Sequence, residues 1–292
     1  MKNIINYYYN LIINEYKKAN DKFIFNIDKT KYEFIIFNGD INKLYEIYFI
    51  VKNSKNYCHE IVLNKDNSIF TLYNNNLYIL IKENISINDK VDIKEIVQYT
   101  ILTSIEGKIH WKELWEKKID YYEYQMSQIS FKYPIIKECF NYYIGLAENA
   151  INLLNYIEKK DIPYYICHKR IEYNQTLEEF FNPISLTLDS WVRDICEYIK
   201  NNYFNEEIDE EKILSLINNF NFSYTDSLLF ISRLLYPSYF FDLYDQIIQN
   251  NISEEKIKKY IKKNTAYEVF LNKIYQLLRN KYALPVIEWL YS

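Results

Sequence analysis

The sequence predicts an α+β protein in two parts, a small mixed N-terminal part over residues 1–85 and a large helical part over residues 86–292. Two observations predict this. Strand-like segments separated by polar turns gather in the first part, whereas apolar residues recur at steps of three and four through the second. Because 49% of the 292 residues are hydrophobic, the chain can bury a proper core and disorder is not expected.

The N-terminal part begins with a helix in which one face is formed by Ile4, Tyr8, Leu11 and Ile12. Asparagines interrupt this segment, so we interpret it as a docking helix and not as a signal peptide. Two strands are then expected within 22–37 around a turn at 28–30, a helix over 41–53, and strands within 58–82 around turns at 65–67 and 74–76. This order is typical of a small α+β unit.

In the C-terminal part we expect no strand between residues 89 and 164. The segment 92–104 is predicted to be helical up to Gly107, and the next helix carries an apolar stripe that includes Trp111 and Trp115. A stripe at this spacing favours a core role for both tryptophans over stacking against a sugar or cofactor. Further helices are expected over 210–220, 225–235, 239–249, 253–263 and 267–281, followed by an apolar tail folded back onto the body.

The stretch 138–200 organises this part. It predicts a long buried helix, a stop at Pro163, a short strand over 164–167, a loop at His168, and a second helix that opens near residue 188. Gly145 lies inside the buried stripe of the long helix. Since a glycine in a helix interior costs about 1 kcal/mol relative to alanine, we expect another backbone to pass close to it.

Composition and charge exclude several classes of function. The net charge is −4 and no segment is strongly basic, so no nucleic-acid partner is expected. The lysines within 256–263 fit the solvated face of a helix. No apolar run approaches the ~20 residues of a membrane span, so we expect a soluble protein. The 32 tyrosines are attributed to the codon bias of an AT-rich genome, with cross-linking tyrosines as the alternative.

The four cysteines, Cys58, Cys139, Cys167 and Cys196, lie in apolar contexts and lack C-x-x-C spacing. Two of them precede a histidine directly, but neighbours on a strand point to opposite faces, so neither pair makes a two-ligand clamp. Buried, reduced thiols are therefore expected, and no metal site.

Five segments carry a resemblance to a known family. In chain order they are WKELW at 111–115 with the KID that follows at 118–120 and Glu123, YYIGLAENAI at 142–151, ICHKR at 166–170, DSWVRD at 189–194, and IEWL at 287–290. They resemble the spore-coat branch of the aminoglycoside phosphotransferase and choline kinase superfamily, the CotS/YutH type, and are closest to the YutH subgroup. The resemblance implies a two-lobed, protein-kinase-like fold with an N-lobe over 1–85 and a C-lobe over 86–292.

The resemblance also implies where phosphoryl-transfer residues would lie. The superfamily places a phosphate-binding lysine on a small-lobe strand, a catalytic Asp two residues after the loop His, and an Asn and a further Asp on the metal ions. Here Arg170 stands where the catalytic Asp would be, Asn174 lacks the compact loop pattern around it, and the strand expected at 32–37 contains no lysine. No catalytic residue is therefore expected in the degenerate loop His168, Lys169, Arg170, and no cofactor-binding residue is assigned.

A few single residues keep two interpretations. Asp189 aligns with the second metal-binding Asp and is the residual catalytic candidate, but it also fits an N-cap of the next helix. His168 has the chemistry of a general base, yet the resemblance favours a residue that supports the loop. Arg193 and Asp194 resemble a structural pair that ties the loop to the following helix.

The leading hypothesis is thus a catalytically degenerate kinase-fold protein, a pseudokinase, that is a structural or assembly component of the bacterial endospore coat. It would be made in the mother-cell cytoplasm, join other spore coat proteins, and need no cofactor. The alternative is an active phosphotransferase that uses Mg-ATP and Asp189 to phosphorylate a coat protein or a small hydroxylated substrate. A third possibility is a cytosolic adaptor unrelated to sporulation.

Overall fold

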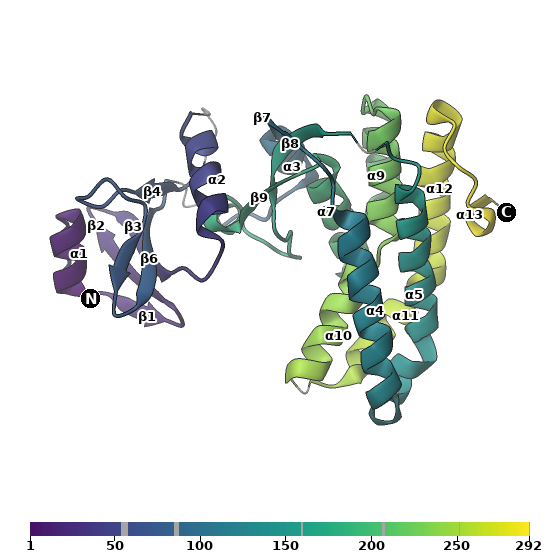
Figure 1. Cartoon of the computed structure of the whole chain (residues 1–292), viewed down its shortest axis with the longest axis horizontal. Coiled ribbons are helices and arrows are strands. Elements are labelled where there is room, and N and C mark those ends of the chain that lie inside the picture. The colour runs from purple at the N-terminus through teal and green to yellow at the C-terminus, as the bar shows by residue number, and fades with distance from the viewer. Residues whose placement is uncertain (54–57, 85–87, 159, 206–207, 251, 292) are drawn as a thin grey trace. The chain divides into compact units, whose positions relative to one another are not determined.

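The computed structural model describes residues 1–53, 58–84, 88–158, 160–205, 208–250 and 252–291 (Figure 1). The chain divides into two compact units. The first contains Met1–Thr103, Ile166–Arg170 and Asn174–Leu188, and the second contains Ser104–Tyr165, Ile171–Tyr173 and Asp189–Ser292. This division falls later than the boundary expected at residue 85, and it assigns the predicted His168 loop to the first unit.

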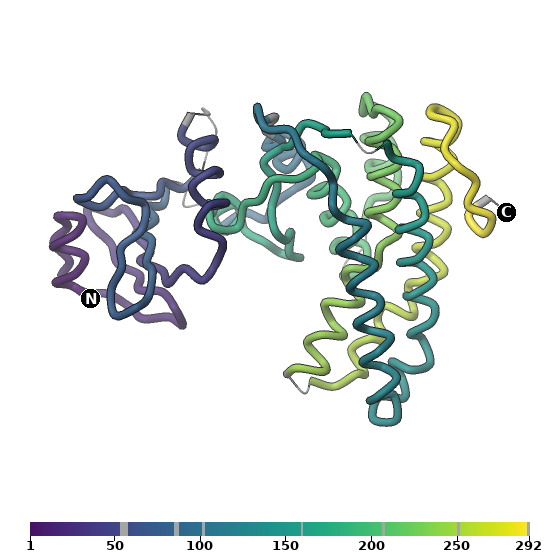
Figure 2. The backbone as a smooth tube through the Cα atoms, viewed as in Figure 1, coloured from purple at the N-terminus to yellow at the C-terminus, as the bar shows by residue number. Residues whose placement is uncertain are grey.

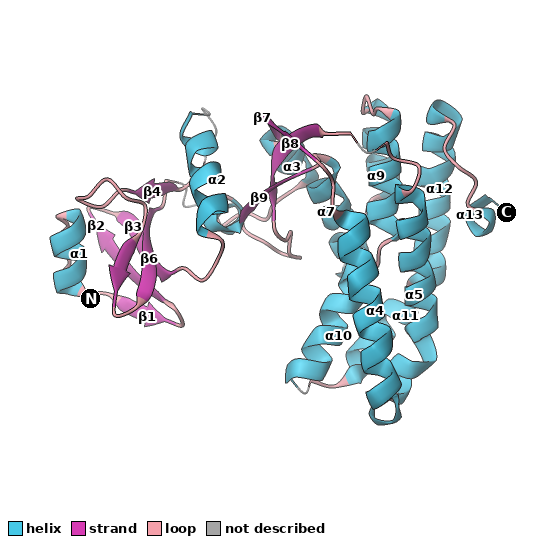
Figure 3. Cartoon of the chain, viewed as in Figure 1, coloured by secondary structure: helices cyan, strands magenta, loops and turns pink. Residues whose placement is uncertain are grey.

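An antiparallel sheet forms the centre of the first unit, with the order β1-β2-β3-β6-β4 and with β5 also paired to β6 (Figure 3). Its strands are β1 (Lys17–Ala19), β2 (Lys22–Ile27), β3 (Thr30–Ile36), β4 (Glu60–Val62), β5 (Thr71–Tyr73) and β6 (Asn76–Lys82). The helices of this unit are α1 (Lys2–Tyr9), α2 (Ile41–Asn53), α3 (Ile93–Tyr99) and the short α6 (Leu177–Phe180). The predicted hairpin, the helix over 41–53 and the strands within 58–82 are confirmed.

Asparagine makes the tight turns of this chain. Among the described residues, nine that are not glycine have a positive φ, and six of these are Asn, including Asn74 and Asn75 in the turn between β5 and β6. None of the three glycines has a positive φ. Asn tolerates the left-handed region better than most residues with a side chain, so it takes the positions where glycine is usual.

A second sheet has three strands in the order β7-β8-β9, and the division between the two units passes through each of them. These are β7 (Ile101–Gly107), β8 (Ile162–His168) and β9 (Leu186–Asp189). The expectation of no strand between 89 and 164 is therefore wrong. The predicted helix ends at Tyr99, and the isoleucines and Thr103 of β7 favour the extended strand that follows.

Helices make up most of the second unit (Figure 2). They are α4 (Trp111–Ile129), α5 (Pro134–Leu154), α7 (Val192–Asn205), α8 (Glu210–Asn219), α9 (Tyr224–Leu235), α10 (Ser238–Asn250), α11 (Lys258–Ile261), α12 (Asn264–Tyr282) and α13 (Glu288–Tyr291). Helix α5 packs against α4 and α9, and α9 packs in turn against α7 and α12. The predicted long helices are thereby confirmed.

The tail after α12 folds back onto that helix, as expected. The hydroxyl of Tyr275 donates to the carbonyl of Pro285 at 2.6 Å and accepts the main-chain N–H of Ile287 at 3.1 Å. All four cysteines are free and buried, which confirms that part of the prediction. Within the described residues, no helix combines the length and apolar character needed to cross a membrane.

The surroundings of Gly145 contradict the expectation that another backbone passes close to it. A Cβ placed on this residue of α5 would meet no heavy atom within 4 Å outside the local helix backbone. No other backbone therefore approaches Gly145 closely, and nothing in the structure explains the glycine.

Gly145→Ala is accordingly expected to raise the free energy of unfolding by about 1 kcal/mol, because alanine favours the helix and its methyl group has room. Urea unfolding followed by tryptophan fluorescence measures this, since all four tryptophans lie in the second unit. Gly107→Ala is the control: its Cβ would lie 2.7 Å from the Tyr164 ring, so no gain is expected there. A loss of stability in Gly145→Ala would contradict the argument.

Candidate functional site

His168, at the end of β8, is buried and holds the segment that follows it. Its Nε2 lies 2.8 Å from the carbonyl oxygen of Phe180, to which it donates, and its ring stacks on the Phe180 ring with the centroids 4.0 Å apart. The ring of Tyr99 lies 5.5 Å away. An imidazole surrounded by aromatic rings and bound to a carbonyl fits the supporting role better than that of a general base.

The next two loop residues lie at the surface. The main-chain N–H of Lys169 donates to the carbonyl of Ser185 at 2.7 Å, and its ammonium donates to the carbonyl of Ile184 at 2.8 Å. Arg170 is exposed. The structure thus presents a cation at the position where the resemblance implies a catalytic base.

Asn174 is exposed in a turn with φ 64°, a left-handed conformation that Asn tolerates. The chain then forms α6, a helix that is not among those predicted from the sequence. A capping box begins this helix: the Thr176 hydroxyl accepts the N–H of Glu179 at 3.3 Å, and the Glu179 carboxylate accepts the N–H of Thr176 at 3.0 Å. The spacing T-x-x-E was the sequence signal that would have found it.

The α6 segment is bound to the rest of the first unit by main-chain contacts. The carbonyl of Phe181 accepts the N–H of His59 at 3.0 Å and the thiol of Cys58 at 3.0 Å. The His59 ring also lies 2.8 Å from the carbonyl of Glu178, and burial lowers the pKa of His59, which favours the neutral ring. The residues after the loop therefore pack as a fixed part of the first unit.

A group of charged side chains surrounds Lys31, and we call Lys22, Lys31, Glu33, Glu83 and Glu178 the Lys31 cluster. The Lys31 ammonium lies 2.6 Å from the carboxylates of Glu83 and Glu178 and 3.7 Å from that of Glu33, which also binds Lys22 at 2.6 Å. Because β3 starts at Thr30, two residues earlier than predicted, this strand does contain a lysine. The expectation of a small-lobe strand without lysine is wrong in that respect.

The carboxylates of the cluster determine what Lys31 can do. Burial lowers its pKa, but hydrogen bonds and charge from Glu178 and Glu83 outweigh this and hold the pKa above its usual value. In protein kinases the strand lysine pairs with a Glu of the following helix and binds phosphates. Here the only acidic residue of α2, Glu46, is exposed, and the described ion pairs of Lys31 go to the cluster. Lys31 neutralises buried carboxylates.

Asp189 ends β9 and lies too far before Val192 to cap α7, so the N-cap interpretation is wrong. Its Oδ2 accepts from the guanidinium of Arg193 at 2.5 Å and from the indole N–H of Trp111 at 3.1 Å, while its Oδ1 accepts the N–H of Ser190 at 2.8 Å. The carboxylate is buried. Arg193 thereby ties the end of β9 to α7.

Trp111 and Trp115 lie in a stack of aromatic rings next to Asp189. The Trp111 and Trp115 rings stack 5.5 Å apart, Trp115 stacks on Tyr236 at 4.2 Å, and the guanidinium of Arg233 lies 4.8 Å from the Trp111 ring. Both tryptophans are buried, as their core role requires, but Trp111 also holds Asp189 through its N–H. Asp194, beside Arg193, is buried as well.

A buried ion-pair network lies next to Arg233. The Lys200 side chain contacts the carboxylate of Glu197 at 2.9 Å, and Arg233 contacts the same oxygen at 2.7 Å. Burial alone would raise the pKa of Glu197, but Lys200 and Arg233 outweigh it and hold that pKa well below its usual range. We call Glu197, Lys200 and Arg233 the Lys200 network.

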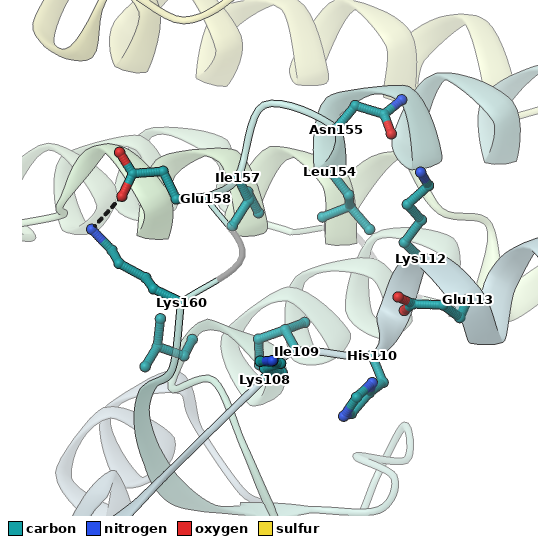
Figure 4. Close-up of a pocket in the computed structure, with 11 residues that line it drawn as sticks. Lys108, Ile109, His110, Lys112, Glu113, Leu154, Asn155, Ile157, Glu158 and Lys160 are labelled. Atoms are coloured by element: carbon teal, nitrogen blue, oxygen red, sulfur yellow. Dashed lines mark ion pairs between the residues drawn. The ribbon is translucent and has the colours of Figure 1, made fainter.

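A cavity of about 320 Å³ opens in the second unit between the start of α4 and the end of α5 (Figure 4). Three lysines, two glutamates and a histidine contribute to its lining, and the two charged residues Glu158 and Lys160 form an ion pair at 2.8 Å. None of the candidate site residues named from the sequence lines it, although Lys112 and Glu113 belong to the WKELW segment. Within the described part of the chain, no group of three His, Cys, Asp or Glu side chains is placed to hold a metal ion.

A comparison with models of protein families shows to which family the chain belongs. The family model described as spore coat putative kinase YutH matches residues 2–274. The chain belongs to this family. The endospore coat-associated protein YutH of Bacillus subtilis (strain 168) is 29% identical over 216 residues, which are 63% of this chain and 62% of that protein. The alignment thus spans less than two thirds of the relative's length.

Solved structures with the same fold are phosphotransferases. An aminoglycoside phosphotransferase from Alicyclobacillus acidocaldarius subsp. acidocaldarius superposes with a TM-score of 0.69 at 9% identity over 96% of both chains. The AMP-bound spectinomycin phosphotransferase APH(9)-Ia gives 0.64 at 13% identity, over 94% of this chain and 96% of that one. At such identities the likeness shows the fold alone, and the predicted α+β, aminoglycoside phosphotransferase-like architecture is confirmed.

For this YutH-family chain, the residue types at the loop were evident from the sequence, whereas their surroundings were not. Sequence reasoning missed the Lys31 cluster and the Lys200 network. A lysine three residues after Glu197 was the available signal for the second of these. No comparable signal exists for Lys31 and Glu178, because they lie 147 positions apart.

Proposed function

We propose that this chain is a catalytically degenerate member of the YutH family that acts as a structural or assembly component of the endospore coat. It would be synthesised in the mother-cell cytoplasm, be deposited in the spore coat, and bind other coat proteins without needing a cofactor. The coat association of the Bacillus subtilis relative supports the location.

The observation that carries the loss of catalysis is the pairing of Asp189. Asp189 is the residual candidate for a metal-binding carboxylate, and its Oδ2 is held by the Arg193 guanidinium at 2.5 Å and by the Trp111 indole. A magnesium ion at that oxygen would face the positive charge of Arg193. Arg170 in place of the base and the commitment of Lys31 to carboxylates add to the argument.

The melting temperature in the presence of Mg-ATP tests this proposal. No metal-dependent change is expected, because neither Asp189 nor Lys31 is free to bind the metal or the phosphates. A rise of several degrees that requires Mg²⁺ and disappears in Asp189→Asn would overturn it and support the active phosphotransferase. Asp189→Asn keeps the shape of the side chain, so the comparison separates lost binding from lost folding.

The hypothesis of a cytosolic adaptor unrelated to sporulation predicts a location other than the spore coat. Expression confined to sporulating cells, with the protein recovered in the coat fraction, rejects the adaptor and agrees with the proposal.

A further inference from the structure

A second cavity, of about 290 Å³, lies in the first unit and is lined by two lysines from different segments. Lys43 comes from the first turn of α2, and Lys169 comes from the loop after β8. Leu44 and Ile47 of α2 supply part of the apolar wall, and both are buried. The volume lies near the lower end of the ~300–1,000 Å³ typical of small-molecule sites, so the cavity suits a small group.

The two lysines differ in how they are held. The main chain and the ammonium of Lys169 are fixed by the carbonyls of Ser185 and Ile184, at 2.7 and 2.8 Å. The ammonium of Lys43 makes no hydrogen bond or ion pair with any residue that the structure describes. One cation of the cavity is thus fixed in place, and the other is available to a ligand.

The charge of the lining is positive. Among the described residues of the lining, Asp40 carries the only carboxylate. Its Oδ1 accepts the main-chain N–H groups of Asn42 at 2.9 Å and Lys43 at 3.1 Å, so it caps α2. Lys43 and Lys169 line the same cavity, so their charges repel each other there. In agreement, burial and then the charge of Lys43 lower the pKa of Lys169. An anion between them would remove that repulsion.

We propose that this cavity binds a phosphate group, with the ammonium groups of Lys43 and Lys169 as its charged partners and the hydroxyl of Thr187 as a neutral donor. Thr187, on β9, lines the same cavity. Two ammonium groups and one hydroxyl match the charge and the acceptor oxygens of a phosphate dianion. The phosphate is either free or carried by a phosphorylated side chain, since both present the same chemistry. None of these residues belongs to the Lys31 cluster.

Calorimetric titration of the full chain tests the proposal, with inorganic phosphate in one arm and O-phospho-L-serine in the other. Saturable binding at one site is expected, weakened about tenfold in Lys43→Gln through the loss of one charge-assisted contact. Lys43→Arg, which keeps the charge, is expected to retain binding. Stronger binding of phosphoserine supports a phosphorylated side chain as the source, and stronger binding of phosphate supports the free ion.

Lys52→Gln is the matched control, because Lys52 is an exposed lysine in the last turn of the same helix. It should leave both titrations unchanged. The proposal is overturned if no saturable binding occurs at millimolar concentrations, or if Lys52→Gln weakens binding as much as Lys43→Gln. Since Lys43 is exposed and its side chain has no described partner, Lys43→Gln is expected to fold, and far-UV circular dichroism verifies this.

A change in melting temperature caused by ATP bound in this cavity can be distinguished from one caused by kinase-like binding of Mg-ATP. It would persist without Mg²⁺ and in Asp189→Asn, and it would be lost in Lys43→Gln.

Discussion

Lys200→Met is expected to lower the free energy of unfolding by about 3–5 kcal/mol. The Lys200 side chain is fully buried, and its ammonium donates to the carbonyls of Arg233 and Tyr236 and to the hydroxyl of Ser238, besides its ion pair with Glu197. The substitution removes all four interactions and leaves the Glu197 carboxylate buried with fewer partners. Urea unfolding followed by tryptophan fluorescence reports on the unit that contains this network.

Lys258→Met is a closely matched control. Lys258 pairs with Glu255 at 2.7 Å over the same three-residue spacing as Lys200 with Glu197, but both side chains are more than half exposed. Its loss is expected to cost less than about 1 kcal/mol. Equal costs for the two substitutions would show that burial does not determine the contribution of the network. Because the pKa of Glu197 is held well below its usual range, the cost should stay constant around neutral pH.

Lys31→Met is expected to destabilise the first unit by about 2–3 kcal/mol at neutral pH, somewhat less than a fully buried pair because the Lys31 side chain is 32% exposed. The change leaves the carboxylates of Glu83 and Glu33, which are 5% and 6% exposed, without their shared cation. Amide hydrogen exchange of β3 and β6 measures the effect, since the tryptophans all lie in the other unit.

The loss of stability in Lys31→Met, which we call its deficit, is expected to depend on pH in one direction. Burial raises the pKa of Glu83, an effect that Lys31 opposes, so the pKa rises further without Lys31. A carboxyl with a raised folded-state pKa adds stability below its unfolded value, and that stability is lost as the pH rises through the folded value. The part of the Lys31→Met deficit that comes from Glu83 is therefore expected to shrink as the pH falls through the raised folded-state pKa of Glu83, and to be absent below 4.5, the ordinary value for Glu.

Lys82→Met, on the neighbouring strand β6, is the control for Lys31→Met. Lys82 pairs with Glu60 at 3.2 Å and both side chains are exposed, so its loss should cost less than about 1 kcal/mol at every pH. A deficit of Lys31→Met that persists at low pH would mean that lost packing, and not unpaired carboxylates, is its cause.

Local spacing was enough to predict the long helices and the hairpins. The apolar residues of α2 recur at helical intervals, and its predicted bounds, 41–53, agree with the structure. The strand β9 was missed because it has four residues, and β7 was missed because it pairs with β8, a segment distant in the chain. The apolar residues of β7 also fit one face of a helix, so only tertiary pairing distinguishes the two.

The candidate site was predictable in its residue types and not in its partners. The residue types Arg170 and Asp189 could be read from the sequence, but the attachment of Asp189 to Trp111 joins residues 78 positions apart. Lys31 was overlooked because the strand begins two residues before its apolar pattern does. Gly145 shows the opposite error, in which a rare residue was given a packing role that its surroundings do not support.

The asparagines in the left-handed turns also affect the chain before it folds. Glycine visits far more backbone conformations than asparagine, so each turn position held by asparagine leaves the unfolded chain with fewer conformations to lose. Where the native turn tolerates a side chain, such a difference amounts to about 0.4–1 kcal/mol per position. The part of the chain that the structure describes has six such asparagines, and the sequence has only three glycines, so restrictions on the denatured ensemble enter the stability of this protein, and no contact in the folded structure records them.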